Sequence, residues 1–323
     1  MKFLKLILIL SLCFFSCKQE KKEAKISDNV EVKIITQKLD NIILSSGTIH
    51  RIESFPSKYV QPRNVDVWLP DNYSKDKKYS VLYMHDGQML FDATTTWNKQ
   101  EWMVDEIASK LMNDGITKDF IVVAMWNISE IRWQDYYPEK SFNYLSESTK
   151  DSVIEVAKKN NFEIKFNADN YLKFITNEVK PYIDSNFSVL TDRENTFISG
   201  SSMGGLISMY AMFEYSDIFG GAACISTHWP GTTPTPNNPL TETIFKYIES
   251  KSIDAKKHKF YFDFGTKTLD QYYPQYEERV NQIFASKGFD ETNFRNLKFE
   301  GADHSENSWQ KRLDIPLTFL LKK

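Results

Sequence analysis

Short apolar runs alternate with helix-spaced apolar segments along most of this chain, and this alternation restricts its fold more than any other feature. Several of the runs, such as FIVVAM, are continuously apolar, which is typical of strands in a parallel sheet that is covered on both faces. The runs lie at residues 65–70, 79–85, 120–126, 195–200, 219–226 and 259–265. Helical patterns lie between or after them, at 101–112, 167–183, 203–215, 269–288 and 308–323. We therefore expect right-handed crossovers and a single α/β domain over residues 36–323.

Composition and charge narrow the class of protein. The 323 residues are 41% hydrophobic and 26% charged, a profile that is typical of a soluble globular chain with one large core. The formal net charge is -3 at pH 7, and lysines alternate with acidic residues instead of forming a basic stripe. This pattern argues against a nucleic-acid partner.

The first 17 residues, MKFLKLILILSLCFFSC, have the pattern of a secretory signal. Two lysines precede an apolar run from Leu6 to Phe15 that is too short to span a bilayer, and Ser16-Cys17 follows it. A small residue before a cysteine resembles the bacterial lipoprotein signal, in which the cysteine becomes the first residue of the mature chain and carries fatty acyl groups such as palmitate. Cys17 suits this role better than Cys13, which follows a leucine.

This N-terminal pattern predicts a signal peptide at residues 1–17 and a flexible tether at 18–35. It also predicts export across the inner membrane and attachment to a membrane as a periplasmic or cell-surface lipoprotein. Two phenylalanines before Ser16 depart from the usual aliphatic pattern, so a signal that is simply cleaved is the alternative. With Cys13 removed and Cys17 acylated, Cys224 is the one remaining thiol, and no intramolecular disulfide is available.

Residues 200–204, Gly-Ser-Ser-Met-Gly, match G-x-S-x-G with Ser202 at the centre, and Ser201 does not fit because its flanking positions are not glycines. An apolar run precedes the motif and a helical pattern follows it, which is the context of a nucleophile elbow. The sharp turn requires small neighbours and exposes the serine hydroxyl. The Met203 N–H at the helix start then becomes a donor to an oxyanion. A structural Gly/Ser turn is the alternative.

A nucleophilic serine needs a base, which follows the nucleophile and the acid in chain order in proteins with such an elbow. His258 lies among lysines, which is typical of a solvated surface residue, and His228 precedes any suitable acid although it could line a pocket. His304 follows an apolar segment at 297–299 and precedes the last helical pattern. We therefore predict His304 as the base, with a structural loop histidine as the alternative.

The acid that orients the histidine is expected after the apolar run at 259–265. Asp270 lies in the loop that follows this run and is the first choice. The competing acidic residues are Asp263 inside the run, Asp303 beside the histidine, and Glu277 and Glu278 on a helical pattern.

An ordered set of five segments resembles an esterase family of the α/β-hydrolase superfamily: YSVLYMHDGQMLFD, WNKQEW, SGSSMGG, FGTKTLD and GADHSENSW. This family includes enterochelin esterases, S-formylglutathione hydrolases, and acetylxylan and feruloyl esterases. The resemblance extends from about Val65 to the C-terminus. It implies an α/β-hydrolase fold, no metal or other cofactor, and a catalytic triad of Ser202, His304 and Asp270.

The resemblance also implies that the loop from His85 to Gln88 provides a second oxyanion donor, from Gly87 or Gln88; a plain Asp-Gly turn is the alternative. The chain departs from the family pattern at two places. Met89 stands where the family often has asparagine, and the family's acid usually lies closer behind the glycine of the seventh strand. The second departure puts the assignment of Asp270 in question.

Two further segments are candidates for substrate contact. Trp133 lies in the aromatic-rich segment 128–167, and His228 and Trp229 lie in the Pro- and Thr-rich segment 227–239. Aromatic side chains at the mouth of a pocket can bind sugars or aryl groups. Packing of both segments onto the body of the protein is the alternative.

The sequence thus predicts a serine esterase that forms an acyl-enzyme and removes acetyl or feruloyl groups from a carbohydrate. The alternatives are an enterochelin-type siderophore esterase and a non-catalytic binding lipoprotein on the same scaffold. The expected partners are a small-molecule or polysaccharide ester and, through Cys17, a membrane. No feature of the sequence specifies an oligomeric state.

Overall fold

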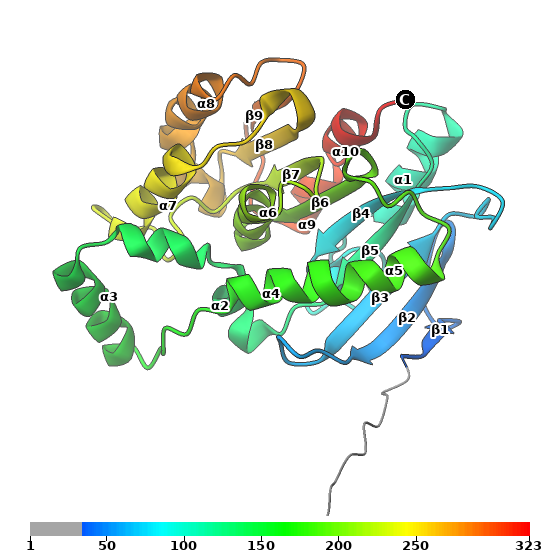
Figure 1. Ribbon diagram of the computed structural model, residues 1–323, viewed down its shortest axis with the longest axis horizontal. Helices are drawn as coiled ribbons and strands as arrows, with labels where there is room; N and C mark the ends of the chain where they lie inside the picture. The colour runs from blue at the N-terminus through cyan, green and yellow to red at the C-terminus, as the bar shows by residue number, and fades with distance from the viewer. Residues whose placement is uncertain (1–33) are drawn as a thin grey trace, which may run out of the picture. The chain divides into compact units, whose positions relative to one another are not determined.

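The computed structural model describes residues 34–323, and a nine-stranded sheet lies at its centre (Figure 1). The order across the sheet is β1-β2-β3-β5-β4-β6-β7-β8-β9. The strands are β1 Thr36–Lys38, β2 Thr48–Phe55, β3 Arg63–Leu69, β4 Ser80–His85, β5 Phe120–Met125, β6 Thr196–Ser201, β7 Gly221–Ile225, β8 Lys259–Gly265 and β9 Phe294–Phe299. The predicted signal at 1–17, including Cys17, and residues 18–33 of the predicted tether lie outside the described residues.

Strands β4 to β9 run parallel, whereas β1, β2 and β3 pair antiparallel and join the sheet through β5. Each apolar run of the sequence forms a strand, and the predicted α/β fold with a mostly parallel sheet is confirmed. The central strands β4, β5 and β6 are buried along their whole length, as expected when helices cover both faces. The sequence pattern did not indicate β1 or β2, because these strands near the edge mix half-exposed polar residues with few buried ones.

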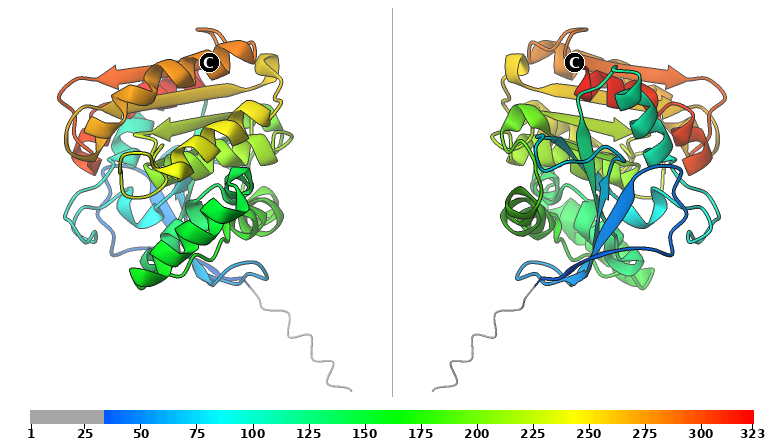
Figure 2. Two further views of the ribbon diagram at one scale, coloured as in Figure 1. Left: turned by 90° about the vertical axis from the view of Figure 1, so that its left-hand side faces the viewer. Right: turned by 90° about the vertical axis from the view of Figure 1, so that its right-hand side faces the viewer.

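Helices cover both faces of the sheet and divide the core into two clusters of buried side chains (Figure 2). On one face, apolar residues of α4 Ala168–Phe174, α5 Lys180–Asn186, α6 Met203–Glu214, α7 Pro239–Ser250 and α8 Glu277–Ser286 pack against the sheet. On the other face, α1 Val104–Asn113 and α10 Asp314–Leu321 cover it. The helical pattern at 167–183 becomes one nearly continuous rod, in which the π-helical turn η4 Ile175–Val179 joins α4 to α5.

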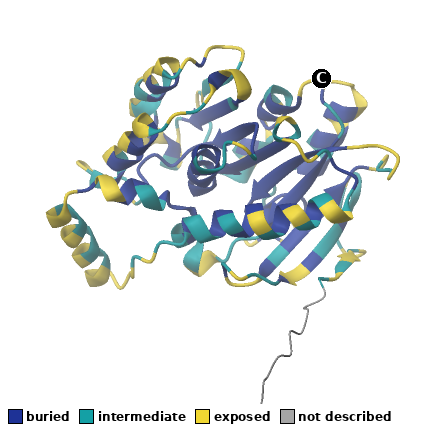
Figure 3. Ribbon diagram, viewed as in Figure 1, coloured by how far each residue is buried: buried dark blue, intermediate teal, exposed yellow. Residues whose placement is uncertain are grey.

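The segment 128–167 forms a succession of short helices beside the body. These are η2 Ser129–Ile131, α2 Arg132–Tyr136, η3 Glu139–Tyr144 and α3 Glu147–Lys159. Helix α2 has buried residues, whereas α3 has none and extends away from the sheet at the left of the view (Figure 3). Within the described residues, 34–323, no helix combines the length and the apolar character that crossing a membrane requires.

The parallel strands bring the loops that carry chemistry to one edge of the sheet. The carboxyl ends of β4, β6, β7, β8 and β9 lie at this edge, which is where ligands bind in open α/β sheets. The short elements that follow these strands are η1 Gly87–Met89, η7 Thr268–Tyr272, η8 Pro274–Tyr276 and α9 Glu306–Gln310. The remaining turns, η5 Arg193–Asn195 and η6 Ala255–Lys257, precede β6 and β8.

Candidate active site

Ser202 lies at a sharp turn between β6 and α6. Its backbone has φ 59 and ψ -121, a conformation that a non-glycine residue adopts only when the surroundings enforce it. The surroundings do so here: the Ser202 N–H donates to the Ile225 carbonyl at 2.9 Å, and the His228 N–H donates to the Ser202 carbonyl at 3.2 Å. A Cβ atom at Gly200 would lie 2.9 Å from the Gly204 carbonyl carbon, so the turn accepts only glycine there. The residues of the G-x-S-x-G motif therefore hold the serine at the tip of a strained elbow.

His304 and Asp270 are in direct contact although 34 residues separate them in the chain. His304 Nδ1 lies 2.5 Å from Asp270 Oδ1. The other oxygen, Asp270 Oδ2, accepts hydrogen bonds from the Gly265 N–H at 2.5 Å and from Ser226 Oγ at 2.6 Å. The Asp270 side chain is fully buried, whereas His304 keeps 14% of its side-chain surface exposed. The hydrogen bonds from Gly265 and Ser226 thus hold the Asp270 carboxylate in place, while the His304 imidazole remains partly exposed to solvent.

Backbone hydrogen bonds hold the two loops together. The Ala302 carbonyl accepts from the N–H groups of Thr266 and Lys267 at 2.9 and 3.0 Å. The His304 N–H donates to Thr268 Oγ1 at 2.8 Å. These contacts fix the loop that carries the histidine relative to the loop that carries the acid, so their geometry does not depend on the imidazole contact alone.

Known esterases resemble this chain in sequence and in fold. The profile of the family described as "Putative esterase" matches residues 57–319. The chain belongs to this esterase family. It is 24% identical over 216 residues to an endo-1,4-beta-xylanase/feruloyl esterase of Xylanibacter ruminicola, a match that covers 64% of this chain and 24% of that protein.

Solved structures of esterases share the fold at low sequence identity. A ferulic acid esterase from Anaeromyces mucronatus has a TM-score of 0.56 and 20% identity, with 89% of this chain and 97% of that chain covered. The ferric enterobactin esterase of Salmonella typhimurium has a TM-score of 0.60 and 14% identity, with 86% of this chain and 59% of that chain covered. At these identities the likeness supports the fold.

The loop after β4 lies against the esterase elbow. A side-chain atom placed on Gly204 would lie 3.3 Å from Asp86 Oδ2, and a Cβ atom on Gly87 would lie 2.7 Å from the Ala124 backbone. Gln88 is held by its side chain, whose Oε1 accepts from the Asn127 N–H at 3.1 Å. Met203 is the first residue of α6, so its N–H has no acceptor within the helix. The three predicted oxyanion donors therefore come from two adjoining segments.

A partly buried ion pair supports this loop. Arg132 on α2 binds Asp86 with two hydrogen bonds, of 2.8 and 2.7 Å, and Asn127 Nδ2 adds a third at 2.6 Å. These partners lower the pKa of Asp86 although burial alone would raise it. Burial lowers the pKa of the adjacent His85 to about 3, so this histidine is neutral at physiological pH. The sequence contains no local signal for this pair, because 46 residues separate its members.

Ser226, which immediately follows β7, connects the acid to a second buried pair. Its Oγ donates to Asp270 and accepts from Trp309 Nε1 at 3.0 Å and from Arg312 Nη2 at 2.9 Å. Arg312 in turn binds Asp263, the competing acid inside β8, at 3.0 Å. Asp263 is therefore paired with Arg312, and the carboxylate that contacts His304 is that of Asp270. Trp309 also packs edge-on against the His304 ring, with the ring centroids 5.0 Å apart.

Tyr273 is a site residue that the sequence did not indicate. Its hydroxyl lies 2.7 Å from His228 Nδ1, and His228 Nε2 lies 2.8 Å from the Thr232 carbonyl. Because a carbonyl only accepts, Nε2 carries the proton, and the tyrosine hydroxyl donates to Nδ1. Burial lowers the pKa of His228 to about 4, which makes it a weak proton acceptor. Through His228, whose backbone N–H donates to the Ser202 carbonyl, Tyr273 is connected to the elbow. Its position three residues after Asp270, directly after η7, is the one available sequence signal.

The two predicted tryptophans occupy different environments. Trp229 is buried in the core, where it stacks on Phe245 with a centroid distance of 5.1 Å. Trp133 is half-buried, stacks on Tyr137 at 4.9 Å and donates from Nε1 to the Gly231 carbonyl at 2.7 Å. It lines a cavity of about 720 Å³ between α3 and the Pro- and Thr-rich segment. The alternative of packing thus describes Trp229, while Trp133 both packs and borders a cavity.

The other competing residues have structural contacts of their own. Asp303 accepts from Ser305 Oγ at 2.5 Å and also binds Ser308 at the start of α9. His258 is buried and not solvated as expected, because its ring nitrogens bind the carbonyls of Asp254 and Ser216 at 2.8 Å each. Glu277 and Glu278 lie in the first turn of α8. Within residues 34–323, none of these four contacts His304 by a hydrogen bond through its side chain.

Proposed function

We propose that the protein is a serine esterase that removes acetyl or feruloyl groups from a carbohydrate through an acyl-enzyme. The observation that carries the proposal is the strained elbow that holds Ser202 beside loops in which His304 Nδ1 contacts Asp270 at 2.5 Å. Such an arrangement supports acyl transfer, because it combines a nucleophile, a base in a fixed tautomer and donors for an oxyanion. Membership of the esterase family supports the same reaction class.

The contacts of Asp270 define the role of each nitrogen of His304. With Nδ1 donating to Asp270, Nε2 carries the lone pair and takes the proton of Ser202 as Oγ attacks the ester carbonyl. The imidazolium then returns this proton to the departing alcohol. In the second half, His304 takes a proton from water as the water oxygen attacks the acyl carbon. The imidazolium then returns this proton to Ser202 Oγ as the bond between Oγ and the acyl carbon breaks and the carboxylic acid leaves. Asp270 stabilises the transient positive charge on the imidazole.

The developing oxyanion requires donors that are already in place. We assign the Met203 N–H, at the start of α6, and the N–H of Gly87 or Gln88 in the adjoining loop to this task. Loss of one such donor typically raises the barrier by about 3–4 kcal/mol. The Asp86–Arg132 pair holds this loop in place, so its effect on the oxyanion is to position the N–H donors of the loop.

The preference for a carbohydrate ester is supported by the similarity to the xylanase/feruloyl esterase and to the ferulic acid esterase. We further propose that Cys17 is acylated and that the protein is exported and held at a membrane, so that it acts on polymers or fragments near the cell surface. This second part is supported by the N-terminal sequence alone.

A fluorophosphonate probe tests the reaction class. The full chain should be labelled at Ser202, and Ser202→Ala should abolish both labelling and the hydrolysis of p-nitrophenyl acetate. Absence of labelling in the intact protein would instead favour the binding lipoprotein. A panel of acetylated xylan, methyl ferulate and a catecholate siderophore ester then separates the substrates: fastest turnover of the siderophore ester would overturn the carbohydrate assignment.

A further inference from the structure

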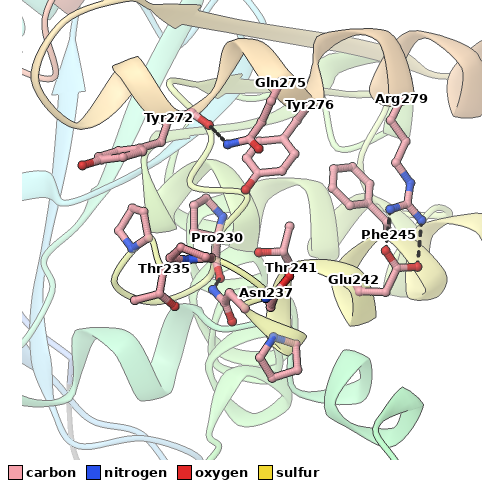
Figure 4. A pocket seen from close by; sticks show the side chains of 14 residues that line it. Pro230, Thr235, Asn237, Thr241, Glu242, Phe245, Tyr272, Gln275, Tyr276 and Arg279 are labelled. Atoms are coloured by element: carbon pink, nitrogen blue, oxygen red, sulfur yellow. Dashed lines mark hydrogen bonds and ion pairs between the residues drawn. The ribbon is translucent and has the colours of Figure 1, made fainter.

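A second cavity has a volume of about 670 Å³, and Figure 4 shows the side chains that line it. Its walls come from the Pro- and Thr-rich segment, from the start of α7 and from η7, η8 and α8. Those segments follow β7 and β8, the same strands whose carboxyl ends precede Ser226 and Asp270. The cavity therefore belongs to the edge of the sheet at which the proposed ester chemistry takes place.

One layer of residues separates this cavity from Ser202. On the inner side Tyr273 binds His228, whose N–H donates to the Ser202 carbonyl at 3.2 Å, while its neighbours Tyr272 and Tyr276 line the cavity on the outer side. Pro230 lines the cavity two residues after His228. A substrate with its ester carbonyl at Ser202 and a remote part several ångströms away would thus extend over Tyr273 into the cavity.

The lining combines flat rings with neutral polar groups. Tyr272 is 43% exposed, and Figure 4 shows its ring and that of Tyr276 bordering the same space as Asn237 and Gln275. Gln275 Nε2 donates to the Tyr272 carbonyl at 2.8 Å, while the Asn237 side chain is exposed at the wall. Rings next to neutral hydroxyl and amide groups suit a ligand that has C–H faces as well as many hydroxyl groups.

The charged residues of the wall distinguish between neutral and acidic ligands. Arg279 donates from Nη1 and Nη2 to Glu242, at 2.6 and 3.0 Å, and from Nη2 to Glu249 at 3.0 Å. Its guanidinium also lies over the Phe245 ring, 4.4 Å from the centroid. The arginine is thus already paired with two carboxylates. A ligand carboxylate would therefore have to compete with Glu242 and Glu249 for this cation, whereas sugar hydroxyls can donate to Glu242.

The cavity wall is also stiff before any ligand arrives. Pro230, Pro234, Pro236 and Pro239 restrict the backbone of the loop. Asn238 bridges it, because Nδ2 donates to the Pro230 carbonyl at 2.7 Å and Oδ1 accepts from the Leu240 N–H at 3.0 Å. Binding to a preorganised loop loses less conformational entropy than binding to a mobile one.

We infer that this cavity is a subsite for the neutral sugar chain of the substrate, with Tyr272 as its stacking platform. The inference rests on the proposed esterase function and specifies where the alcohol part of the ester lies. It predicts binding of uncharged β-1,4-linked pentose or hexose oligosaccharides and weaker binding of uronic-acid oligomers. Tyr272 is a binding residue that takes no part in the proton transfers.

Calorimetric titration of the full-length Ser202→Ala protein tests this inference without any need for turnover. We expect xylotetraose or cellotetraose to bind, and the affinity to fall at least tenfold in Ser202→Ala/Tyr272→Ala. Tyr144→Ala is the matched control, because Tyr144 is 40% exposed on η3 and is not among the residues that line the cavity. Ser202→Ala/Tyr144→Ala should bind both sugars like the parent. Tri-galacturonate should bind more weakly than either neutral sugar.

In the active protein, Tyr272→Ala should lower the ratio of kcat/KM for acetylated xylo-oligosaccharide to kcat/KM for p-nitrophenyl acetate about tenfold, mainly through KM, whereas Tyr144→Ala should preserve this ratio. The subsite is refuted if neither tetrasaccharide binds, if Tyr272→Ala behaves like Tyr144→Ala, or if tri-galacturonate binds best. These outcomes are distinct from failure of the esterase proposal, which would appear as an unlabelled Ser202 in the fluorophosphonate experiment.

Discussion

Asp270 has every acceptor position on its inner oxygen in use. Oδ2 binds the Gly265 N–H and Ser226 Oγ, and this leaves Oδ1 for His304. Ser226 is equally committed, since it donates once and accepts from both Trp309 and Arg312. A carboxylate with such partners cannot rotate without breaking a buried hydrogen bond, and this explains how a residue on a surface loop is held in a single orientation.

Asp270→Asn should lower kcat by about 10⁴, the loss seen when the acid of such a triad becomes an amide. The Gly265 N–H requires an acceptor, so the amide oxygen must take the inner position and the NH₂ group must face His304. The imidazole then protonates at Nε2 and can no longer accept the serine proton. Hydrolysis of p-nitrophenyl acetate measures the effect.

Asp303→Asn provides the control for this prediction. Asp303 lies next to His304 in the chain but binds Ser305 and Ser308, so its amide variant should lose less than about tenfold in kcat. Equal losses in the two variants would contradict the assignment of Asp270 as the acid.

The sequence indicates those of the proposed catalytic residues that have a local signature. Ser202 is proposed from glycine spacing, and His304 from its loop between a strand and the last helices. Tyr273, Arg132 and Ser226 were not indicated, because their roles depend on partners 44 to 46 residues away and on which loop the fold brings beside them. Exposure could not be predicted for Trp229 or His258, since both lie in polar surroundings in the sequence yet are buried in the structure.

At the scale of elements, the connection from α9 to α10 is locked to β8 through Arg312 and Asp263. Both side chains are nearly inaccessible, at 4% and 0% exposure. Two guanidinium nitrogens bind the carboxylate, which also accepts from the Ser226 N–H at 3.0 Å and from the Tyr261 hydroxyl at 2.9 Å. The pair therefore joins the C-terminal helices to the strand that precedes the acid loop.

Arg312→Met should lower the free energy of unfolding by about 3–5 kcal/mol, because it leaves the Asp263 charge buried without its cation. Arg312→Met/Asp263→Asn should recover part of this loss, since no uncompensated charge remains. Urea denaturation followed by circular dichroism measures both variants. Additive losses in the double variant would show that packing, and not the ion pair, determines the effect.

Helix α1 begins with a group of carboxylates that makes stability depend on pH. Oxygen atoms of Glu101, Asp105 and Glu106 lie within 4.8 Å of one another. Burial, a hydrogen bond to Glu106 and the charge of Glu106 raise the pKa of Asp105 to about 7. The folded chain thus keeps a proton on Asp105 that the unfolded chain releases at lower pH, so the contribution of Asp105 to the free energy of unfolding should fall as the pH rises towards 7.

Asp105→Asn should remove this dependence and stabilise the protein at pH 8 by about 1 kcal/mol, a value well below the full shift because the group is partly screened. The amide oxygen can still accept from the Ser45 N–H, now bonded at 2.7 Å, while its NH₂ group can donate to Glu106. Unfolding midpoints of the wild type and of the variant at pH 5 and pH 8 give the test. The stability gained by Asp105→Asn should be larger at pH 8 than at pH 5, and an equal or smaller gain at pH 8 would contradict the prediction.

The sequence pattern predicted the alternation of strands and helices correctly but missed individual elements. The parallel strands and most of the long helices carry long apolar patterns, whereas β2 alternates polar residues at the edge and α7, after a proline-rich loop, was not predicted. The segment 128–167 contains aromatic residues that pack against one another, but its helix α3 fully buries no residue and has only a short apolar stripe, of which Val153 and Ile154 pack against the core.

At the scale of the whole molecule, the chain separates the reaction from the proposed anchor. All proposed catalytic loops lie at the carboxyl edge of the parallel strands, within the compact unit Ile34–Lys323. Residues 18–35 can span at most about 60 Å when fully extended. A protein acylated at Cys17 would therefore act only on esters that come within this length plus the breadth of the folded unit from the membrane, which suits a polymer or fragment delivered at the cell surface.

Cys17→Ser should release the protein from the membrane fraction of a bacterial host and move it from the detergent phase to the aqueous phase in Triton X-114 partitioning. The reason is that acyl chains bind a bilayer in proportion to their buried CH₂ groups, and serine cannot carry the thioether-linked lipid. Cys13→Ser is the matched control, because it changes the other signal cysteine and should leave partitioning as in the wild type. If both variants stay in the detergent phase, an acyl group on Cys17 is not what holds the protein there. If the wild type itself is found in the aqueous phase, the signal is simply cleaved and the reach of residues 18–35 no longer restricts the substrate.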